Sequence, residues 1–254
     1  MLTLLIGNKN YSSWSMRPWV AMKAAGIAFE EVQIRLDTPE FKAQVREFVG
    51  SDFMGTSIAA GKVPVLKHAR AGQADLIVWD TLAIIETLHE SFHENKPNAM
   101  IWPTDARQRA RARSLCAEMH AGFGGVRGGL PMNIESVPAE YAHVQDKVNA
   151  PAVLADIARI SQLWLSCLEN PSLNAADGSY LNGAFLFGDW CAADAYFAPV
   201  VMRFNSYAVV DKLPAKLQAY CAAVTNHFAV QAWIQAALVE HDFIAYDEPY
   251  RMKK

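Results

Sequence analysis

Strand-like and helix-like patterns of hydrophobic and polar residues alternate over the first 92 residues of the chain. Short apolar or alternating runs of strand length lie at residues 2–6, 29–35, 63–66 and 76–79. Amphipathic or polar helical patterns lie at residues 19–25, 38–48 and 82–92. The predicted order is therefore βαβαββα. Such an order implies a parallel pair of strands joined by a crossover helix, followed by an antiparallel hairpin.

Beyond residue 104 the pattern changes to long, alanine-rich helical segments. These are predicted at residues 105–123, 139–169, 191–207, 213–226 and 228–241. Glycines between residues 122 and 129 are expected to break the helical pattern after the first of them. We therefore predict an α/β domain at residues 1–93, a linker at 94–104 and an all-helical domain at 105–254.

A polar loop with two adjacent serines, Ser12 and Ser13, connects the first strand to the first helix. Pro18 lacks the amide hydrogen that a helix interior needs, so we expect it in the first three helical positions, with the N-cap at Ser15 or later. Ser12 and Ser13 would then precede the helix, near free N–H groups and the positive end of its dipole. That location stabilises a carboxylate or a thiolate. A hydroxyl-rich cap without chemistry also explains the loop.

Two further features of the α/β domain suit the binding of a short peptide. Val63-Pro64 stands at the entry to a strand and is a natural place for a cis bond. A cis bond there would turn the backbone of Val63 outward, where an extended peptide can pair with it. Asp80-Thr81 opens a helix and offers an acceptor for an ammonium group and donors for a carboxylate. A strand-start proline and an ordinary helix cap are the alternative explanations.

Composition and charge exclude several classes of partner. The chain has 254 residues, 52% of them hydrophobic and 19% charged, which is ordinary for a globular protein. Its net charge of -3 gives no reason to expect a nucleic acid or an anionic membrane, and no apolar run is long enough for a membrane span. We see no signal peptide. The four cysteines are widely spaced without a metal-binding pattern, so we expect no metal and free thiols in a reducing cytoplasm.

The chain resembles a cytosolic glutathione transferase over essentially its whole length. The resemblance rests on the order of the elements, the Val63-Pro64 step, the acidic-hydroxyl pair Asp80-Thr81 and a capping-box motif at residues 188–194, where Cys191 replaces the usual serine or threonine. It implies a thioredoxin-like N-terminal domain, a helical C-terminal domain and glutathione as co-substrate. It also implies a cytoplasmic homodimer that detoxifies small electrophiles.

The serine loop is similar to that of serine-using members of this family. Residues 11–17 resemble the S-S-C-S-x-R motif of the zeta class, and the gap from serine to arginine is also that of the tau class. The resemblance implies that Ser12 is catalytic, Ser13 is the second serine and a hydroxyl stabilises the glutathione thiolate. Lys62 matches a lysine that reaches the glycine carboxylate, although a solvated loop lysine explains it equally. Arg17 is expected to brace the loop through an ion pair.

The electrophile pocket is expected between the serine loop and the first helices of the helical domain. Its candidate residues are Trp14, His120, Phe123 and Arg127, for which packing roles are the alternative. Trp14 stands where relatives have cysteine, which argues against thiol-disulfide chemistry. The carboxylate-binding pattern of the zeta class is not found after Asp194, although Arg203 lies nearby.

Three functions remain open on sequence grounds. The first is conjugation of glutathione to a mostly apolar electrophile. The second is a glutathione-dependent isomerase of the maleylacetoacetate type, or a lyase or etherase. The third is a non-catalytic binding protein of the same fold. An insertion-like segment at residues 51–60 has no explanation in the sequence.

Overall fold

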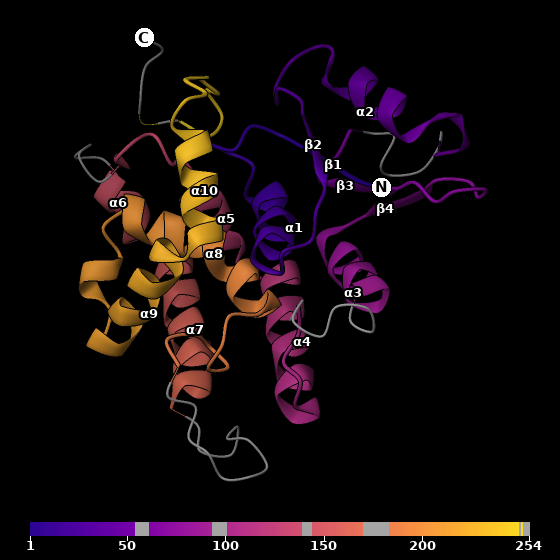
Figure 1. Cartoon of the computed structure of the whole chain (residues 1–254). Coiled ribbons are helices and arrows are strands. Elements are labelled where there is room, and N and C mark those ends of the chain that lie inside the picture. The colour runs from indigo at the N-terminus through magenta and orange to yellow at the C-terminus, as the bar shows by residue number, and fades with distance from the viewer. Residues whose placement is uncertain (54–60, 93–100, 139–143, 170–182, 249, 251–254) are drawn as a thin grey trace.

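A four-stranded mixed sheet forms the centre of the N-terminal part of the chain (Figure 1). The computed structural model describes residues 1–53, 61–92, 101–138, 144–169, 183–248 and 250. The strands are β1 (Leu2–Ile6), β2 (Glu30–Gln33), β3 (Val65–His68) and β4 (Leu76–Trp79), in the spatial order β2-β1-β3-β4. β1 is parallel to β2 and antiparallel to β3, which pairs antiparallel with β4. The predicted βαβαββα order is confirmed.

Both faces of this sheet are covered by helices. Leu5 of β1 packs with Val45 and Val49 of α2 (Phe41–Val49) on one face. Leu4 and Ile6 point to the other face, where α1 (Ser13–Ala24) and α3 (Thr81–Phe92) lie. Successive residues of a strand point to opposite faces, so a strand buried on both sides is a continuous apolar run. This is why Leu2–Ile6 carries little alternation.

The first helix begins earlier than the sequence predicts. Its N-cap is Ser12, so the prediction of a cap at Ser15 or later is wrong, and Pro18 lies inside the helix. Pro18 therefore offers no N–H to the carbonyl of Trp14. The buried face of α1 offsets this loss, because nearly the whole helix is enclosed between the sheet and the helical part of the chain. Ser15 is fully buried, and its hydroxyl accepts a hydrogen bond from Gly7 N–H at 3.1 Å.

The helical part packs around one buried helix, α8. Its elements are α4 (Ala106–Ala121), α5 (Gly124–Gly129), α6 (Val144–Val148), α7 (Pro151–Leu168), α8 (Ala192–Ser206), α9 (Ala215–Asn226) and α10 (Phe228–Ala237). α8 contacts α1, α4 and α9, and a single hydrophobic core runs from the sheet through α1 into this part. The sheet, α1 and α8 consequently form successive layers, and the serine loop lies where the two parts of the chain meet (Figure 1).

Two predicted helical boundaries are corrected by the structure. The segment 139–169 holds two helices in its described part, because Pro151 begins a new helix at a position where its missing N–H costs nothing. The glycine-rich stretch forms the short helix α5, whose N-cap Phe123 has a left-handed backbone with φ 60°. Residues 54–60 of the insertion-like segment and residues 94–100 of the predicted linker lie outside the described residues.

A capping box holds the start of α8. The Cys191 side chain accepts from the backbone N–H of Asp194, and the Asp194 carboxylate accepts from Cys191 N–H at 2.9 Å. Asp194 also accepts from Leu186 N–H at 3.1 Å and from the Tyr220 hydroxyl at 3.2 Å. The motif at residues 188–194 therefore supports folding.

Replacing Cys191 with serine is expected to stabilise the protein by about 0.5 kcal/mol, because a hydroxyl oxygen caps a helix better than sulfur. Urea unfolding measures the change. Cys221→Ser is the matched control: Cys221 is equally buried on α9, and burial alone raises its pKa to about 12. A hydroxyl there is expected to destabilise the fold by about 1 kcal/mol. Equal destabilisation by both changes would contradict the capping argument.

Candidate functional site

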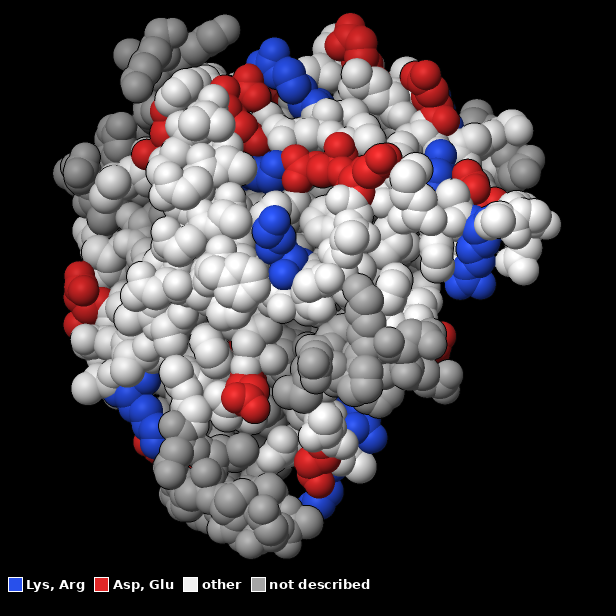
Figure 2. All heavy atoms as spheres, viewed as in Figure 1, with Lys and Arg blue, Asp and Glu red and all other residues white. Residues whose placement is uncertain are grey.

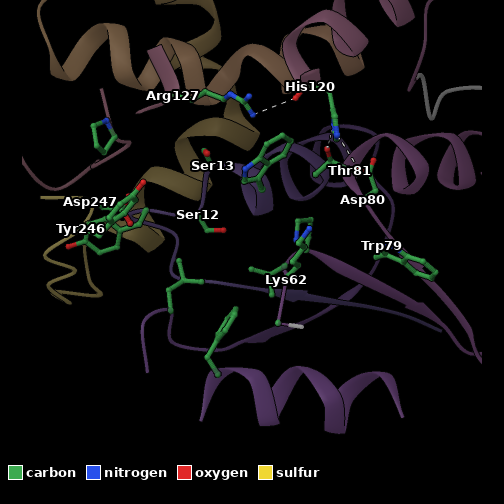
Figure 3. A pocket seen from close by; sticks show the side chains of 18 of the residues that line it. Ser12, Ser13, Lys62, Trp79, Asp80, Thr81, His120, Arg127, Tyr246 and Asp247 are labelled. Carbon is green, nitrogen blue, oxygen red and sulfur yellow. Dashed lines mark hydrogen bonds and ion pairs between the residues drawn. The ribbon is translucent and has the colours of Figure 1, made fainter. Parts of the chain in front are cut away.

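A cavity of about 690 Å³ lies between the N-terminal part and the helical part of the chain (Figure 3). Its volume is in the range typical of small-molecule sites. All predicted site residues except Phe123 line it: Ser12, Ser13, Trp14, Lys62, Val63, Pro64, Asp80, Thr81, His120 and Arg127. These residues come from segments far apart in the sequence. The fold alone brings them together.

Phe123 is placed elsewhere. Its side chain is buried in the main hydrophobic core, and it does not line the cavity. The left-handed backbone at Phe123 sets the direction in which the chain turns from α4 into α5. Phe123 thus positions Arg127 indirectly, through the helix that carries it.

The two serines have different hydrogen-bond partners. Ser12 Oγ donates to Ser15 Oγ at 2.7 Å, so it makes no capping bond to the helix. Ser13 N–H donates to Tyr11 O at 2.8 Å, but the Trp14 and Ser15 N–H groups have no acceptor among the described residues and keep their capacity to bind an anion. Ser13 Oγ accepts from Arg203 Nη2 at 3.2 Å. Both side chains are largely buried, with 7% and 8% of their surface exposed.

Arg203 on α8 is a buried guanidinium that donates only to neutral acceptors among the described residues. Besides Ser13, it donates from Nε to Leu130 O at 2.8 Å and from Nη1 to Pro199 O at 3.1 Å. Burial, together with the neighbouring positive charge of Arg17, lowers the pKa of Arg203 to about 10. A pKa lowered in this way indicates that the surroundings offer too little negative charge to balance the guanidinium.

Trp14 lies among cationic side chains. The guanidinium carbon of Arg17 lies 4.1 Å from its ring centroid and that of Arg127 lies 5.4 Å away. His120 packs edge-on against the same ring at 5.0 Å. The ion pair predicted for Arg17 is not formed with any described residue. Arg17 is instead enclosed by the rings of Trp14 and Tyr196, and burial lowers its pKa to about 10.

Val63 and Pro64 border the cavity on the side of β3. The Val63-Pro64 bond is cis, as its position in the sequence favoured. Among the described residues, Val63 makes no backbone hydrogen bond with a neighbouring segment, so its polar groups can pair with an extended ligand. Lys62 is exposed at the same edge. Figure 3 shows Lys62 and the serines on different sides of one open space.

The Asp80-Thr81 pair is tied to the helical part of the chain. Asp80 Oδ1 accepts from Leu82 N–H at 2.8 Å and caps α3, while its Oδ2 lies 3.1 Å from His120 Nε2. The Thr81 hydroxyl lies 2.5 Å from the Tyr196 hydroxyl. Burial lowers the pKa of His120, and Asp80 offsets this only in part, so a neutral imidazole donates from Nε2 to Asp80 at neutral pH.

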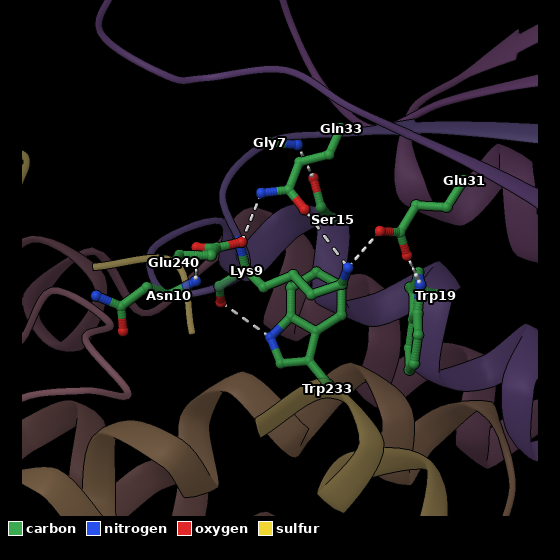
Figure 4. Close-up of polar contacts among 9 residues, drawn as sticks. All are labelled: Gly7, Lys9, Asn10, Ser15, Trp19, Glu31, Gln33, Trp233 and Glu240. Carbon is green, nitrogen blue, oxygen red and sulfur yellow. Dashed lines mark hydrogen bonds and ion pairs between the residues drawn. The ribbon is translucent and has the colours of Figure 1, made fainter. Parts of the chain in front are cut away.

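The segment after α10 packs on the loop that precedes the serines (Figure 4). Glu240 accepts from the backbone N–H groups of Lys9 and Asn10 at 2.6 and 3.0 Å, and from Gln33 Nε2 at 2.6 Å. The Lys9 ammonium group pairs with Glu31 and lies within 6 Å of the ring centroid of Trp233. The C-terminal segment therefore fixes the backbone from which the serine loop starts.

Further along, the same segment reaches the cavity itself. The Tyr11 hydroxyl donates to Asp242 O at 2.6 Å and contacts Glu248, and burial raises the Tyr11 pKa. Tyr246 and Asp247 line the cavity beside Ser12 (Figure 3). Burial raises the pKa of Asp247 to about 6, and Arg203 opposes that shift.

Sequence reasoning missed part of this site. Tyr196, Tyr246 and Asp247 carry no motif, and their role follows from the path of the chain after it leaves the helical core. The sequence gives Arg203 no role beyond its position near the place where the zeta-class carboxylate-binding pattern is missing. The informative signal was its position on an otherwise apolar stretch, residues 195–204, where a charge must be buried or face a cavity.

Other features of the described chain add little to the site. Among the described residues, no cluster of His, Cys, Asp or Glu side chains has the makings of a metal site. In the same part of the chain, no helix has the length and hydropathy to cross a membrane. All four cysteines are free and buried, as predicted. On the face shown in Figure 2, acidic and basic side chains are intermixed and separated by uncharged surface, so this face has no extended basic area.

One family model matches part of the chain, and several solved structures are similar to it. Residues 11–91 match the family model of the glutathione S-transferase N-terminal domain. No curated protein matches the chain by sequence.

Three of the similar structures are a glutathione transferase homolog, a maleylacetoacetate isomerase and a tau-class transferase. A glutathione transferase homolog from Burkholderia with bound glutathione is 22% identical, with a TM-score of 0.60, over 93% of this chain and 97% of that one. A maleylacetoacetate isomerase from Anaeromyxobacter dehalogenans with bound glutathione is 20% identical, with a TM-score of 0.57, over 95% and 98%. A tau-class transferase from mango is 16% identical, with a TM-score of 0.59, over 93% and 95%. The chain therefore has the glutathione transferase fold, as predicted.

Proposed function

We propose that this protein binds glutathione in the cavity and ionises its thiol beside Ser12 and Ser13 for attack on a small electrophile. One observation carries the proposal. The serine loop at the start of α1, the cis Val63-Pro64 step and the Asp80-Thr81 pair line a single cavity. The match of residues 11–91 to the transferase N-terminal domain supports the same ligand.

Each element has a chemical role in this proposal. The outward backbone of Val63 pairs with the peptide as an added strand, and Lys62 attracts its glycine carboxylate. Asp80 keeps a half-exposed carboxylate for the ammonium group at the other end. The serines, with the Trp14 and Ser15 N–H groups of α1, favour the thiolate over the thiol, whose ordinary pKa is about 8.5.

Binding and turnover test the proposal separately. Calorimetry with glutathione is expected to show one site per chain. Asp80→Ala is expected to weaken the affinity about tenfold or more, because it leaves the ammonium group without its anion. Glutamate at the exposed position 169 provides a control: Glu169→Ala removes a carboxylate of the helical part far from the cavity. No measurable binding by the unaltered protein would refute the proposal.

Conjugation is the reaction we favour, measured with a chlorodinitrobenzene-type substrate. An isomerase acting on a carboxylate-bearing substrate is the second candidate, because Lys62, Arg127 and Arg203 give the cavity a cationic lining. Binding without any turnover, unchanged by Ser12→Ala and Ser13→Ala, would instead favour a non-catalytic binding protein. We further propose a serine-type enzyme that acts in the cytoplasm as a homodimer.

A further inference from the structure

Within the serine loop, the two hydroxyls are not equivalent as donors. A serine hydroxyl has one proton to donate. Ser12 donates its proton to Ser15 Oγ, which also accepts from Gly7 N–H, so Ser12 belongs to a buried brace between the loop and the end of β1. Ser13 instead receives a hydrogen bond from Arg203, and no described residue accepts its proton.

Given the proposed function, on which this inference rests, we infer that Ser13 is the hydroxyl that donates to the glutathione thiolate. Arg203 acts as a positioning residue that holds Ser13 Oγ and increases the acidity of its O–H. The thiol proton leaves to solvent, Ser13 keeps its own proton, and the new contact is an O–H···S hydrogen bond. Ser12 has a bracing role. This assignment reverses the order that the resemblance to the zeta class implies.

The charges around the cavity favour an anion at this point. Arg203 and Arg17 are buried guanidiniums without a carboxylate partner among the described residues. Arg17 and Arg127 both lie over the ring of Trp14. An unbalanced cation within about 4–6 Å of a thiol lowers the thiol pKa by about 1–3 units. Ser13 transmits this effect because it touches both the guanidinium and the cavity.

The opposing charges come from other elements packed against the same space. Asp80 at the start of α3 is engaged by His120 of α4, and Asp247 of the C-terminal segment lies near Arg203. The titratable and charged groups that line the cavity are Tyr11, Lys62, Asp80, His120, Arg127, Arg203, Tyr246 and Asp247, and Arg17 is buried behind the Trp14 ring. Cations predominate in this set, so the net field lowers the thiol pKa.

The pH dependence of the bound thiol tests the assignment. Glutathione is bound to each variant, and the ultraviolet absorbance of the thiolate is followed against pH, together with the rate for the chlorodinitrobenzene-type substrate. Ser13→Ala is expected to raise the apparent thiol pKa by about 1–2 units and to lower the rate below that pKa about 10- to 100-fold. Ser12→Ala is expected to shift the thiol pKa by less than half as much as Ser13→Ala does. It is expected to lower the melting temperature more than Ser13→Ala does.

Arg203 is tested with a conservative and a neutral variant. Arg203→Met is expected to raise the thiol pKa by about one unit, and Arg203→Lys, which keeps the charge, by less. The effects of Ser13→Ala and Arg203→Met should not add, since both act through one contact. Arg203 also holds two backbone carbonyls. If Arg203→Met does not fold, Ser12→Ala and Ser13→Ala still decide the assignment. Ser114→Ala, on the exposed face of α4, controls for loss of a hydroxyl.

The outcomes separate this inference from the proposed function. A larger pKa shift in Ser12→Ala than in Ser13→Ala would overturn the assignment while leaving glutathione binding intact. An unchanged pKa in a folded Arg203→Met variant would overturn the role of Arg203. Absence of glutathione binding and of a thiolate signal in the unaltered protein would instead refute the proposed function.

Discussion

Asp194→Ala is expected to destabilise the protein by about 3–5 kcal/mol, a large share of the stability of an ordinary domain. The change removes the shared acceptor of Leu186 N–H, Cys191 N–H and the Tyr220 hydroxyl, all of them buried. Each buried donor left without a partner costs about 1–3 kcal/mol. Relief from burying a carboxylate recovers part of that cost.

Denaturant unfolding, monitored by circular dichroism, measures this effect. Asp189→Ala is the matched control, because Asp189 lies on the exposed side of the same turn, and surface substitutions usually change stability by less than about 0.5 kcal/mol. If Asp194→Ala resembled this control, the hydrogen bonds to Asp194 would have no energetic importance.

The pH dependence of stability gives a second view of Asp194. Burial raises its pKa from 3.8 to about 6, against the lowering effect of the hydrogen bonds that it accepts. Between these values the folded state binds more protons than the unfolded state, so the contribution of Asp194 to stability is greatest below pH 3.8 and is lost as the pH rises through 6. The stability difference between the unaltered protein and Asp194→Asn should therefore change in this window and be constant above it.

Glu240→Ala is expected to cost about 2–4 kcal/mol and to lower turnover at least tenfold. It leaves the N–H groups of Lys9 and Asn10 without their acceptor, while both residues are buried, with 5% and 1% of their surface exposed. The loop that leads to Ser12 and Ser13 then loses its fixed position. Because the loop places the reacting groups, we expect the loss mainly in kcat.

The kinetics of Glu240→Ala are to be compared with those of Glu169→Ala. Glu169 is an exposed residue whose ion pair with Lys216 spans 3.8 Å, and such surface pairs contribute little. A variant that is destabilised but has an unchanged kcat would show that Glu240 supports the fold without controlling the serine loop.

Local patterns were enough to predict most elements of this fold. The strand Leu76–Trp79 has the bounds that its apolar run predicts, and α8 departs from its predicted span by one residue at each end. The prediction of where α1 starts was wrong, and the reason is physical. The rule for Pro18 considers one lost hydrogen bond, whereas burial against both the sheet and α8 sets the length of the helix.

Prediction of the cavity was limited in a similar way. Ser12, Val63 and Asp80 lie in segments whose local chemistry already suggests a ligand, so their sequence context was sufficient. Arg203 and Asp247 acquire their positions from tertiary packing. Arg203 is placed by the packing of α8 in the core, and Asp247 by the contacts of the C-terminal segment with the serine loop. No periodicity in the sequence contains that information.

The contacts between Glu240 and the loop at Lys9 join two regions separated by almost the entire chain. Contacts so distant along the sequence are slow to form, because a long stretch of chain has to be closed before they stabilise anything. A folding intermediate that holds the sheet and α1 but not the segment after α10 has no acceptor for these two N–H groups. We therefore expect the serine loop to gain its order late in folding, after the helical part has packed.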